Sequence, residues 1–252
     1  MASASAAIAL MASSPPVLAA EAAPQHRARA SPSGYDVSYP QCGSRLPAGG
    51  AFGIVGVTDG LPWSQNPCLA TEYAWAAARP RPSFYMNTAD PGPVSSHWGF
   101  PGPRACADPT SSSDAGCAYD YGWNAAADAF GAASRTASPS AAAGAAWWLD
   151  VELANSWNGG AAANAADLEG SVDYLRGVGV ASVGVYSTAA QWRQLTAGYR
   201  FPGSPAVLSW VAGATSLRGA VRACAAPSSA FTGGPVALAQ YPSSAFDADY
   251  PC

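Results

Sequence analysis

Short apolar runs recur along this chain and alternate with stretches of helical character. The runs are continuous and rich in β-forming residues, which is typical of parallel strands that are buried on both faces. We expect strands at residues 35–39, 52–58, 83–88, 147–152, 182–187, 206–212 and 236–241. We expect helices at residues 67–79, 121–134, 164–177 and 188–195.

This alternation over residues 34–252 predicts one α/β domain, a single TIM-like (β/α) barrel. The alternative is an open doubly wound sheet, whose nucleotide-binding form needs GxGxxG after its first strand. Here that strand is followed by Pro40-Gln41-Cys42-Gly43. Little room for a helix remains near the end of the chain, so we expect the last strands to be joined with few or no helices, in a hairpin-like ending. The loop-like segment 91–122 should lie above the carboxyl ends of the strands, where barrel enzymes hold their sites.

Residues 1–23 are typical of a signal peptide. An apolar part that starts at Ala6 ends in small residues that offer cleavage after Ala19. No positive charge precedes the apolar part, so an Ala-rich tail is the alternative. Residues 24–33 are polar and proline-bearing, as in a disordered spacer. We therefore expect a secreted, extracellular protein.

Six cysteines follow this leader. An even number in an exported chain favours disulfides, and no CxxC or CxxxC pair offers the ligand spacing of a zinc site. Six cysteines allow 15 pairings. Proximity in the sequence favours the pairs Cys42–Cys68, Cys106–Cys117 and Cys224–Cys252. We expect no metal and no cofactor.

Charged residues make up only 11% of the chain, which has 12 arginines, no lysine, 16 acidic residues and a net charge of −4. Nucleic-acid binding draws its main driving force from clustered basic side chains, and a membrane-spanning helix needs a run of ~20 apolar residues. The sequence has neither feature. We therefore expect no nucleic-acid partner and no membrane span, and we expect a monomer.

The two histidines give little support to nucleophile–histidine chemistry. His26 lies in the spacer, and His97 lies in a loop. A Ser-His-Asp or Cys-His enzyme would depend on His97 alone, and no GxSxG motif accompanies it. The carboxylates are better candidates.

Asp150 and Glu152 lie two residues apart at the end of the strand expected at 147–152. Strand alternation points both side chains to the same face, with Cα atoms ~6.6 Å apart. On a barrel strand, the inward face at the carboxyl end is the mouth of the active site. Asp36, on the first strand, should reach the same mouth.

Two neighbouring carboxylates in a semi-apolar mouth repel one another, which raises one pKa and leaves a protonated acid beside an ionised partner. Glycosidic cleavage needs this division, because one group protonates the leaving oxygen while the other stabilises positive charge on the sugar. A D-x-E pair also occurs as a structural hydrogen-bond acceptor or cap. The pair alone leaves that alternative open.

The chain has nine tryptophans and eleven tyrosines, most of which should be core residues. Trp147 and Trp148 are adjacent on one strand, so one should face the barrel interior and the other the helices. Trp98, Trp157 and Trp210 fall in loops or at strand ends. We expect Trp157 and Trp210 to stack on a sugar ring.

Five segments, in order, resemble motifs of glycoside hydrolase family 25, the lysozyme-type muramidases. They are GYDVSYPQ, WWLDVE, VGVYST, VLSWVAG and ALAQYPSSAFDADY. Their order and spacing match from about Gly34 to Cys252. The chain is also similar to actinobacterial glycoside-hydrolase-like domains of unassigned activity. The resemblance implies a barrel whose last strands lack intervening helices.

The resemblance also implies roles for the matching residues. Glu152 is expected to be the proton donor, and Asp150 the nucleophile or the group that orients a substrate N-acetyl attacking in its place. Asp36 is expected to be an active-site carboxylate. The substrate-binding residues that we expect are Tyr85, Asn87, Trp157, Tyr186, Trp210, Gln240, Asp247 and Asp249. The strand-three segment SFYMNTADPG and the loop between Cys106 and Cys117 depart from the family pattern.

The expected function is a secreted glycosidase that cleaves β-glycosidic bonds in N-acetylated glycans, with peptidoglycan as the substrate. The alternative is a non-catalytic cell-wall or carbohydrate-binding protein on a glycosidase-like barrel. The sequence shows no wall-binding repeat, and its net charge of −4 offers no attraction to an anionic wall. A structural exported protein without a ligand is a third interpretation, which an apolar mouth without carboxylates would favour.

Overall fold

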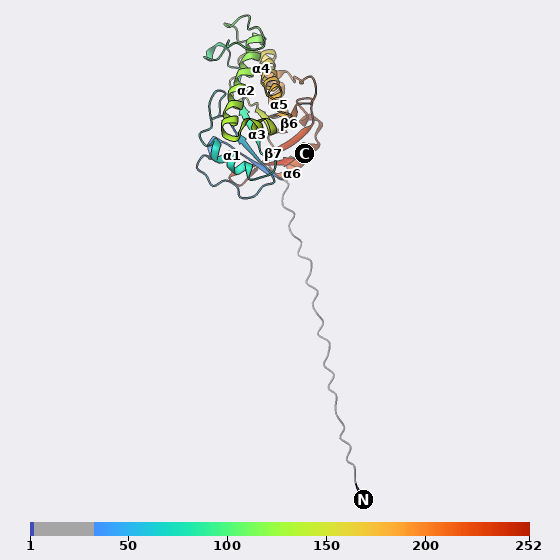
Figure 1. Cartoon of the computed structure of the whole chain (residues 1–252). Helices are drawn as coiled ribbons and strands as arrows, with labels where there is room; N and C mark the ends of the chain where they lie inside the picture. Colours follow the sequence, from blue (N-terminus) through green and yellow to red (C-terminus); the bar gives the residue numbers. More distant parts are fainter. Residues whose placement is uncertain (3–32) are drawn as a thin grey trace.

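The computed structural model describes residues 1–2 and 33–252. The expected signal peptide and spacer lie almost wholly outside these residues. In the described part, eight strands close into one barrel, and helices cover its outside (Figure 1). The strands are β1 (Gly34–Val37), β2 (Gly53–Gly56), β3 (Ser83–Asn87), β4 (Ala146–Asp150), β5 (Val183–Ser187), β6 (Leu208–Val211), β7 (Val236–Ser243) and β8 (Phe246–Pro251).

The order of the strands around the barrel follows the sequence. β1 to β7 run parallel, whereas β8 is antiparallel to both of its neighbours, β7 and β1. The predicted barrel is therefore confirmed, and each of the seven predicted strands overlaps one of β1 to β7. β7 and β8 form the hairpin-like ending, through a tight turn in which Ser244 has a φ of 60°.

The helices are α1 (Leu69–Ala77), α2 (Ala115–Ala137), α3 (Pro139–Gly144), α4 (Gly160–Gly177), α5 (Ala189–Thr196) and α6 (Leu217–Ala225). α2 begins before the expected residue 121, because Asp114 caps it by accepting a hydrogen bond from the backbone N–H of Cys117. α3 and α6 were not predicted. α6 lies between β6 and β7, and no helix separates β7 from β8.

α2 and α4 pack against each other over a long contact. A Cβ at Gly122 would stand 1.9 Å from the backbone oxygen of Asp167, and one at Gly170 would stand 2.1 Å from that of Tyr119. Only glycine fits at these two positions, and the helices approach closely because of it. No helix in the described part of the chain is long and apolar enough to cross a membrane.

The barrel separates two apolar layers. Beneath the helices lie side chains such as Phe84, Met86, Trp147, Leu149 and Val185. The barrel interior holds Phe52, Ile54, Trp148, Trp210 and Leu238. Trp147 thus faces the helices and Trp148 the interior, as the alternation predicts. A Cβ at Gly184 would stand 2.3 Å from the ring of Trp148, so this glycine leaves the space that the indole fills.

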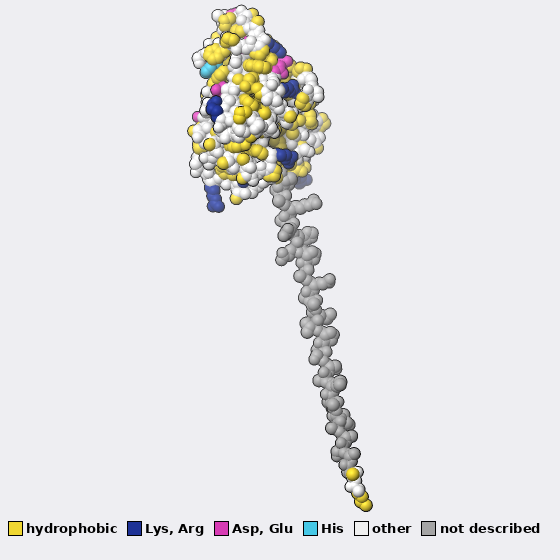
Figure 2. All heavy atoms as spheres, viewed as in Figure 1, with side chains coloured by type: hydrophobic (Ala, Val, Ile, Leu, Met, Phe, Trp, Pro, Cys, Tyr) yellow, Lys and Arg dark blue, Asp and Glu magenta, His cyan; other side chains and the backbone are white. Residues whose placement is uncertain are grey.

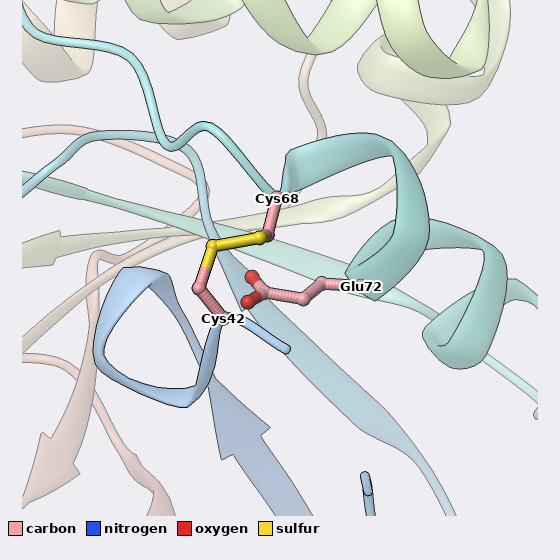
Figure 3. A group of neighbouring side chains, drawn as sticks. All are labelled: Cys42, Cys68 and Glu72. Atoms are coloured by element: carbon pink, nitrogen blue, oxygen red, sulfur yellow. A yellow bond between two sulfur atoms is a disulfide. The ribbon is translucent and has the colours of Figure 1, made fainter. Parts of the chain in front are cut away.

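The structure contains the three disulfides that proximity in the sequence favours. The Cys42–Cys68 disulfide lies beside the buried side chain of Glu72 (Figure 3). The Glu72 carboxylate accepts a hydrogen bond of 2.6 Å from Asn66. Because the two sulfur atoms are bonded to each other, they are not available as thiolate ligands for a metal.

Candidate active site

A cavity of about 180 Å³ opens at the carboxyl ends of the parallel strands. Inward-facing positions at the ends of barrel strands share one space, so residues far apart in the sequence meet there. Its lining consists of Asp36, Pro40, Gln41, Tyr85, Asp150, Glu152, Tyr186, Trp210, Gln240 and Asp247. All of these except Pro40 and Gln41 were predicted as site residues. Both missed residues lie in the 3-10 helix Tyr39–Gln41, shortly after the carboxyl end of β1, and this position is the signal that could have found them.

Asp150 is the last residue of β4, and Glu152 lies in the loop that follows, so the strand ends earlier than expected. Both side chains still reach the cavity. Asp150 is buried, with 6% of its surface exposed, whereas Glu152 is half-buried. The loop is held in place by Trp157, whose indole N–H donates to the backbone oxygen of Glu152 at 2.8 Å.

One oxygen of Asp150 is held, and the other is free. Asn87 lies opposite Asp150 in the register of β3 and β4, and its Nδ2 donates a hydrogen bond to Asp150 Oδ2. The amide is fixed by Thr58, whose hydroxyl donates to Asn87 Oδ1 at 2.7 Å. Asp150 Oδ1 is buried and has no hydrogen-bond partner. An incoming hydrogen-bond donor would therefore meet an unpartnered oxygen there.

The two carboxyl groups of the D-x-E pair differ in acidity. Burial raises the pKa of Asp150 well above its usual range, and the charges of Glu152 and Asp36 raise it further. Burial alone also raises the pKa of Glu152. Burial thus raises both pKa values, and it raises that of the more deeply buried Asp150 further.

A chain of hydrogen bonds crosses the cavity from β5 to β1. The hydroxyl of Tyr186 donates to Gln240 Oε1 at 2.7 Å, and Gln240 Nε2 donates to Asp36 Oδ2 at 3.0 Å. The amide of Gln240 thus accepts on one side and donates on the other. This arrangement orients the carboxylate of Asp36 toward the cavity wall.

Asp36 also interacts with a second buried carboxyl group, that of Asp249 on β8. Burial raises the pKa of Asp36 to about 7, opposed by the hydrogen bond from Gln240 and assisted by the charge of Asp247. Burial and the charge of Asp36 raise the pKa of Asp249 well above its usual range. The carboxyl groups of Asp36 and Asp249 therefore titrate as a coupled pair, and the charge of one raises the pKa of the other.

Aromatic side chains form one wall of the cavity. The ring centroid of Trp210 lies 4.7 Å from that of Tyr186 and 6.3 Å from that of Tyr85, both edge-on. The Trp210 indole donates to Asp249 Oδ1 at 2.8 Å. Because Trp210 is only 2% exposed, it supports the wall and offers little free face to a sugar.

Three predicted site residues do not line the cavity. Asn87 lies behind Asp150, and Asp249 lies behind Asp36 and Trp210. Trp157 stands beside the cavity, where it supports the loop of Glu152. These three residues contact side chains or backbone atoms of residues that line the cavity, but they do not line it themselves.

The charge of the cavity has one sign. Four of its lining residues are carboxylic acids, namely Asp36, Asp150, Glu152 and Asp247. None of the lining residues, all of which are in the described part of the chain, is arginine, lysine or histidine. Such a site repels anions and stabilises positive charge that develops during a reaction. An oxocarbenium-like transition state carries such a charge.

The chain is similar to known lysozymes in part of its sequence and in its fold. No family profile matches the chain. A segment of 52 residues is 44% identical to the probable GH family 25 lysozyme 4 of Dictyostelium discoideum. The match covers 21% of this chain and 24% of that protein, so it spans about a quarter of the curated relative.

Solved structures match over most of the chain. The bacterial lysozyme from Streptomyces coelicolor aligns with a TM-score of 0.57 and 16% identity, over 88% of this chain and 93% of that chain. A muramidase from Trichobolus zukalii gives 0.56 and 16%, over 87% and 93%. A family GH25 lysozyme from Aspergillus fumigatus gives 0.56 and 14%, over 86% and 91%. These comparisons support the resemblance found in the sequence: the chain has the barrel fold of the glycoside hydrolase family 25 lysozymes.

Proposed function

We propose that this protein is a lysozyme-like glycoside hydrolase that cleaves β-glycosidic bonds in peptidoglycan. The observation that carries the proposal is the pair Asp150 and Glu152 at the mouth of a barrel with this fold. The uniformly acidic lining supports it, because cleavage of a glycosidic bond develops positive charge on the sugar.

Glu152 is the proposed proton donor. It is half-buried at the cavity, so it can approach a glycosidic oxygen and still exchange its proton with water. Burial raises its pKa, which increases the protonated fraction at mildly acidic pH. The hydrogen bond from Trp157 to its backbone oxygen limits its movement.

Asp150 is the proposed nucleophile, or the group that orients a substrate N-acetyl group attacking in its place. Burial raises the pKa of Asp150 well above its usual range, whereas either role needs the ionised carboxylate. An acetamido N–H that donates to the unpartnered Oδ1 of Asp150 would stabilise the ionised form and lower its pKa. Binding of an N-acetylated sugar would thus favour an ionised Asp150.

The remaining residues of the cavity are proposed to stabilise the developing positive charge and to position the groups that do so. Asp36 faces the cavity from β1 and, when ionised, adds negative charge that stabilises the developing cation. Tyr186 and Gln240 hold its orientation. Tyr85 and Asp247 line the space that the sugar would enter.

We further propose that the protein is secreted and acts outside the cell as a monomer. Its three disulfides are consistent with an oxidising compartment. Residues 1–23 would be the signal peptide and 24–33 a spacer, which leaves residues 34–252 as the mature domain.

The test compares release of reducing ends from purified peptidoglycan by the parent protein and by Glu152→Gln. Loss of a general acid costs about 10²–10⁴-fold in rate, and the isosteric change should leave the unfolding transition unmoved. Glu169→Gln is the matched control, because Glu169 lies on α4 in an exposed ion pair with Arg104 and should keep full activity.

Retained activity in Glu152→Gln would contradict the proposed role of Glu152. If neither the parent nor Glu152→Gln releases reducing ends while both bind the glycan, the protein is a non-catalytic carbohydrate-binding protein on the same barrel.

A further inference from the structure

Exposed apolar side chains are concentrated in the loops at the mouth end of the barrel. The large ones that follow β1 to β4 are Tyr39, Leu61, Val94, Phe100 and Leu153. Elsewhere in the described chain, only Met1 and two residues of α6 are large, apolar and exposed. In Figure 2, hydrophobic side chains are visible at the upper end of the molecule as well as over the rest of this face, and Figure 1 shows that the upper end is the loop between β3 and α2.

Aromatic rings from two of these loops pack together. Trp63, in the loop after β2, stacks on His97 of the β3–α2 loop, with ring centroids 4.1 Å apart and planes 4° apart. The ring of Phe100 stands edge-on to both, at 6.2 Å from Trp63 and 5.4 Å from His97. Phe100 is 44% exposed, so the cluster presents a ring to solvent.

Contacts join this cluster to the cavity. Tyr39, which is 40% exposed, directly precedes Pro40 and Gln41, and both of those line the cavity. The hydroxyl of Tyr39 lies 2.9 Å from where a Cβ at Gly60 would stand, so it touches the loop that carries Trp63. We refer to Tyr39, Trp63, His97 and Phe100 together as the aromatic ridge: Tyr39 adjoins residues that line the cavity, and the three packed rings lie in the loops after β2 and β3.

The outer end of the ridge is held rigidly. The Cys106–Cys117 disulfide joins the β3–α2 loop to the first turn of α2. Trp98 is 8% exposed and packs in a small core of its own with Tyr121, against which Trp63 also packs. A surface that is already ordered loses little conformational entropy when a ligand binds.

We propose that the aromatic ridge binds further sugar units of the glycan strand whose cleavage is proposed at Asp150 and Glu152. The substrate class rests on the proposed function, whereas the ridge itself rests on the contacts above. Sugars present apolar C–H faces that pack on aromatic rings, and this attraction needs no charge. The ridge has no arginine or lysine, so a neutral glycan fits it better than a phosphate-bearing ligand does.

The proposal has a direct consequence for ligand length. A short oligosaccharide can occupy the cavity alone, whereas a long one can also reach the ridge. Affinity should therefore rise with the number of sugar units, and the increase should depend on Tyr39 and Phe100.

The experiment measures binding by calorimetry in the Glu152→Gln background, so that cleavage does not interfere. The probes are the dimer and the hexamer of N-acetylglucosamine. Phe100→Ser should weaken hexamer binding by about tenfold and leave dimer binding unchanged. Phe100→Tyr keeps a ring at this place and should keep the affinity. Leu217→Ser, at an exposed apolar position on α6, is the matched control and should change neither affinity.

Equal hexamer affinity for Phe100→Ser and the control would overturn the proposal, provided that circular dichroism shows both to be folded. Loss of binding to phosphatidylcholine vesicles, without loss of hexamer binding, would also overturn it and make the ridge a membrane-contact surface. The proposed cleavage is judged separately by reducing ends. A ridge that binds the hexamer in a protein without hydrolytic activity would therefore leave this inference standing and remove the enzyme.

Discussion

The half of the barrel interior nearer the mouth (the upper half) differs from the half farther from the mouth (the lower half) in the polarity of its side chains. The lower half holds Phe52, Ile54, Trp148 and Leu238, all of them buried and apolar. The upper half holds carboxylic acids whose pKa values are raised by burial, among them Asp36, Asp150 and Asp249. The lower half follows the rule for a stable core, and the upper half breaks it.

The lower half of the interior therefore serves mainly stability, and the upper half serves the proposed function. Burying an apolar ring stabilises the folded state, whereas burying an ionisable carboxyl group costs free energy unless it is protonated or hydrogen-bonded. Trp210 joins the halves, since its ring contacts Trp148 at 5.5 Å and its N–H donates to Asp249. Substitutions in the lower half should therefore reduce stability, and substitutions in the upper half should reduce activity or even increase stability.

The largest expected effect is in the lower half. Trp148→Ala removes a buried indole and leaves a void that the closed barrel cannot fill by collapse. The free energy of unfolding in urea should fall by about 3–5 kcal/mol. A decrease of less than about 1 kcal/mol would mean that the interior repacks freely, and that the two halves are not as distinct as their contacts indicate.

In the upper half, Asp36→Asn should increase the free energy of unfolding at alkaline pH, whereas Trp148→Ala decreases it. The pKa of Asp36 is about 7 in the folded state and about 3.9 in an unfolded chain, so the folded state binds the proton more tightly. Stability contributed by this proton is present below about pH 4 and is lost as pH rises to about 7. At pH 8 the variant should be more stable than the parent by on the order of 4 kcal/mol, and at pH 4 the two should be alike.

Urea unfolding at a series of pH values checks this prediction. Asp59→Asn, at an exposed position, is the matched control and should follow the parent at every pH. A parent protein whose stability is the same at pH 5 and pH 8 would show that the Asp36–Asp249 pair does not take up a proton on folding.

Asn87 should control the acidity of Asp150. Asn87→Ala removes the donor to Asp150 Oδ2, so kcat should fall by about 10–100-fold with little change in KM. Asn87→Asp places a negative charge there instead, which raises the pKa of Asp150 and shifts the acidic limb of the pH–rate profile to higher pH. A profile that is identical in the parent and Asn87→Asp would remove Asn87 from this role.

The smallest effect is expected at Thr58. Thr58→Val removes the hydroxyl that donates to Asn87 Oδ1 while keeping the shape of the side chain. Stability should fall by about 1 kcal/mol, and kcat by less than in Asn87→Ala. If Thr58→Val lowers kcat further in the Asn87→Ala background, the hydroxyl acts on the reaction independently of the amide.

Much of the fold was readable from the sequence, because parallel strands buried on both faces leave continuous apolar runs. β8 was harder to find, since two aspartates interrupt its residues FDADYP and leave no continuous apolar run. α6 (LRGAVRACA) was missed, although Ser216 caps it by accepting a hydrogen bond from the backbone N–H of Gly219. Local patterns thus revealed the elements that are buried on both faces better than those that are not.

The site was predictable where one strand carries the signal, as in the D-x-E of β4. The Asp36–Asp249 pair was not predictable as a pair, because it depends on how β8 closes the barrel against β1. Asn87 was predicted as a ligand for substrate, but its register with Asp150 makes it a partner of that carboxylate. Such contacts are set by strand register, which a single sequence does not reveal.

The antiparallel direction of β8 has a consequence for attaching the protein to a surface. β1 starts at Gly34 and β8 ends at Pro251, both at the end of the barrel opposite the mouth. A linker joined to either terminus would therefore leave the mouth pointing away from its support. A bead or a fusion partner attached at either end of the barrel would leave access to Asp150 and Glu152 open.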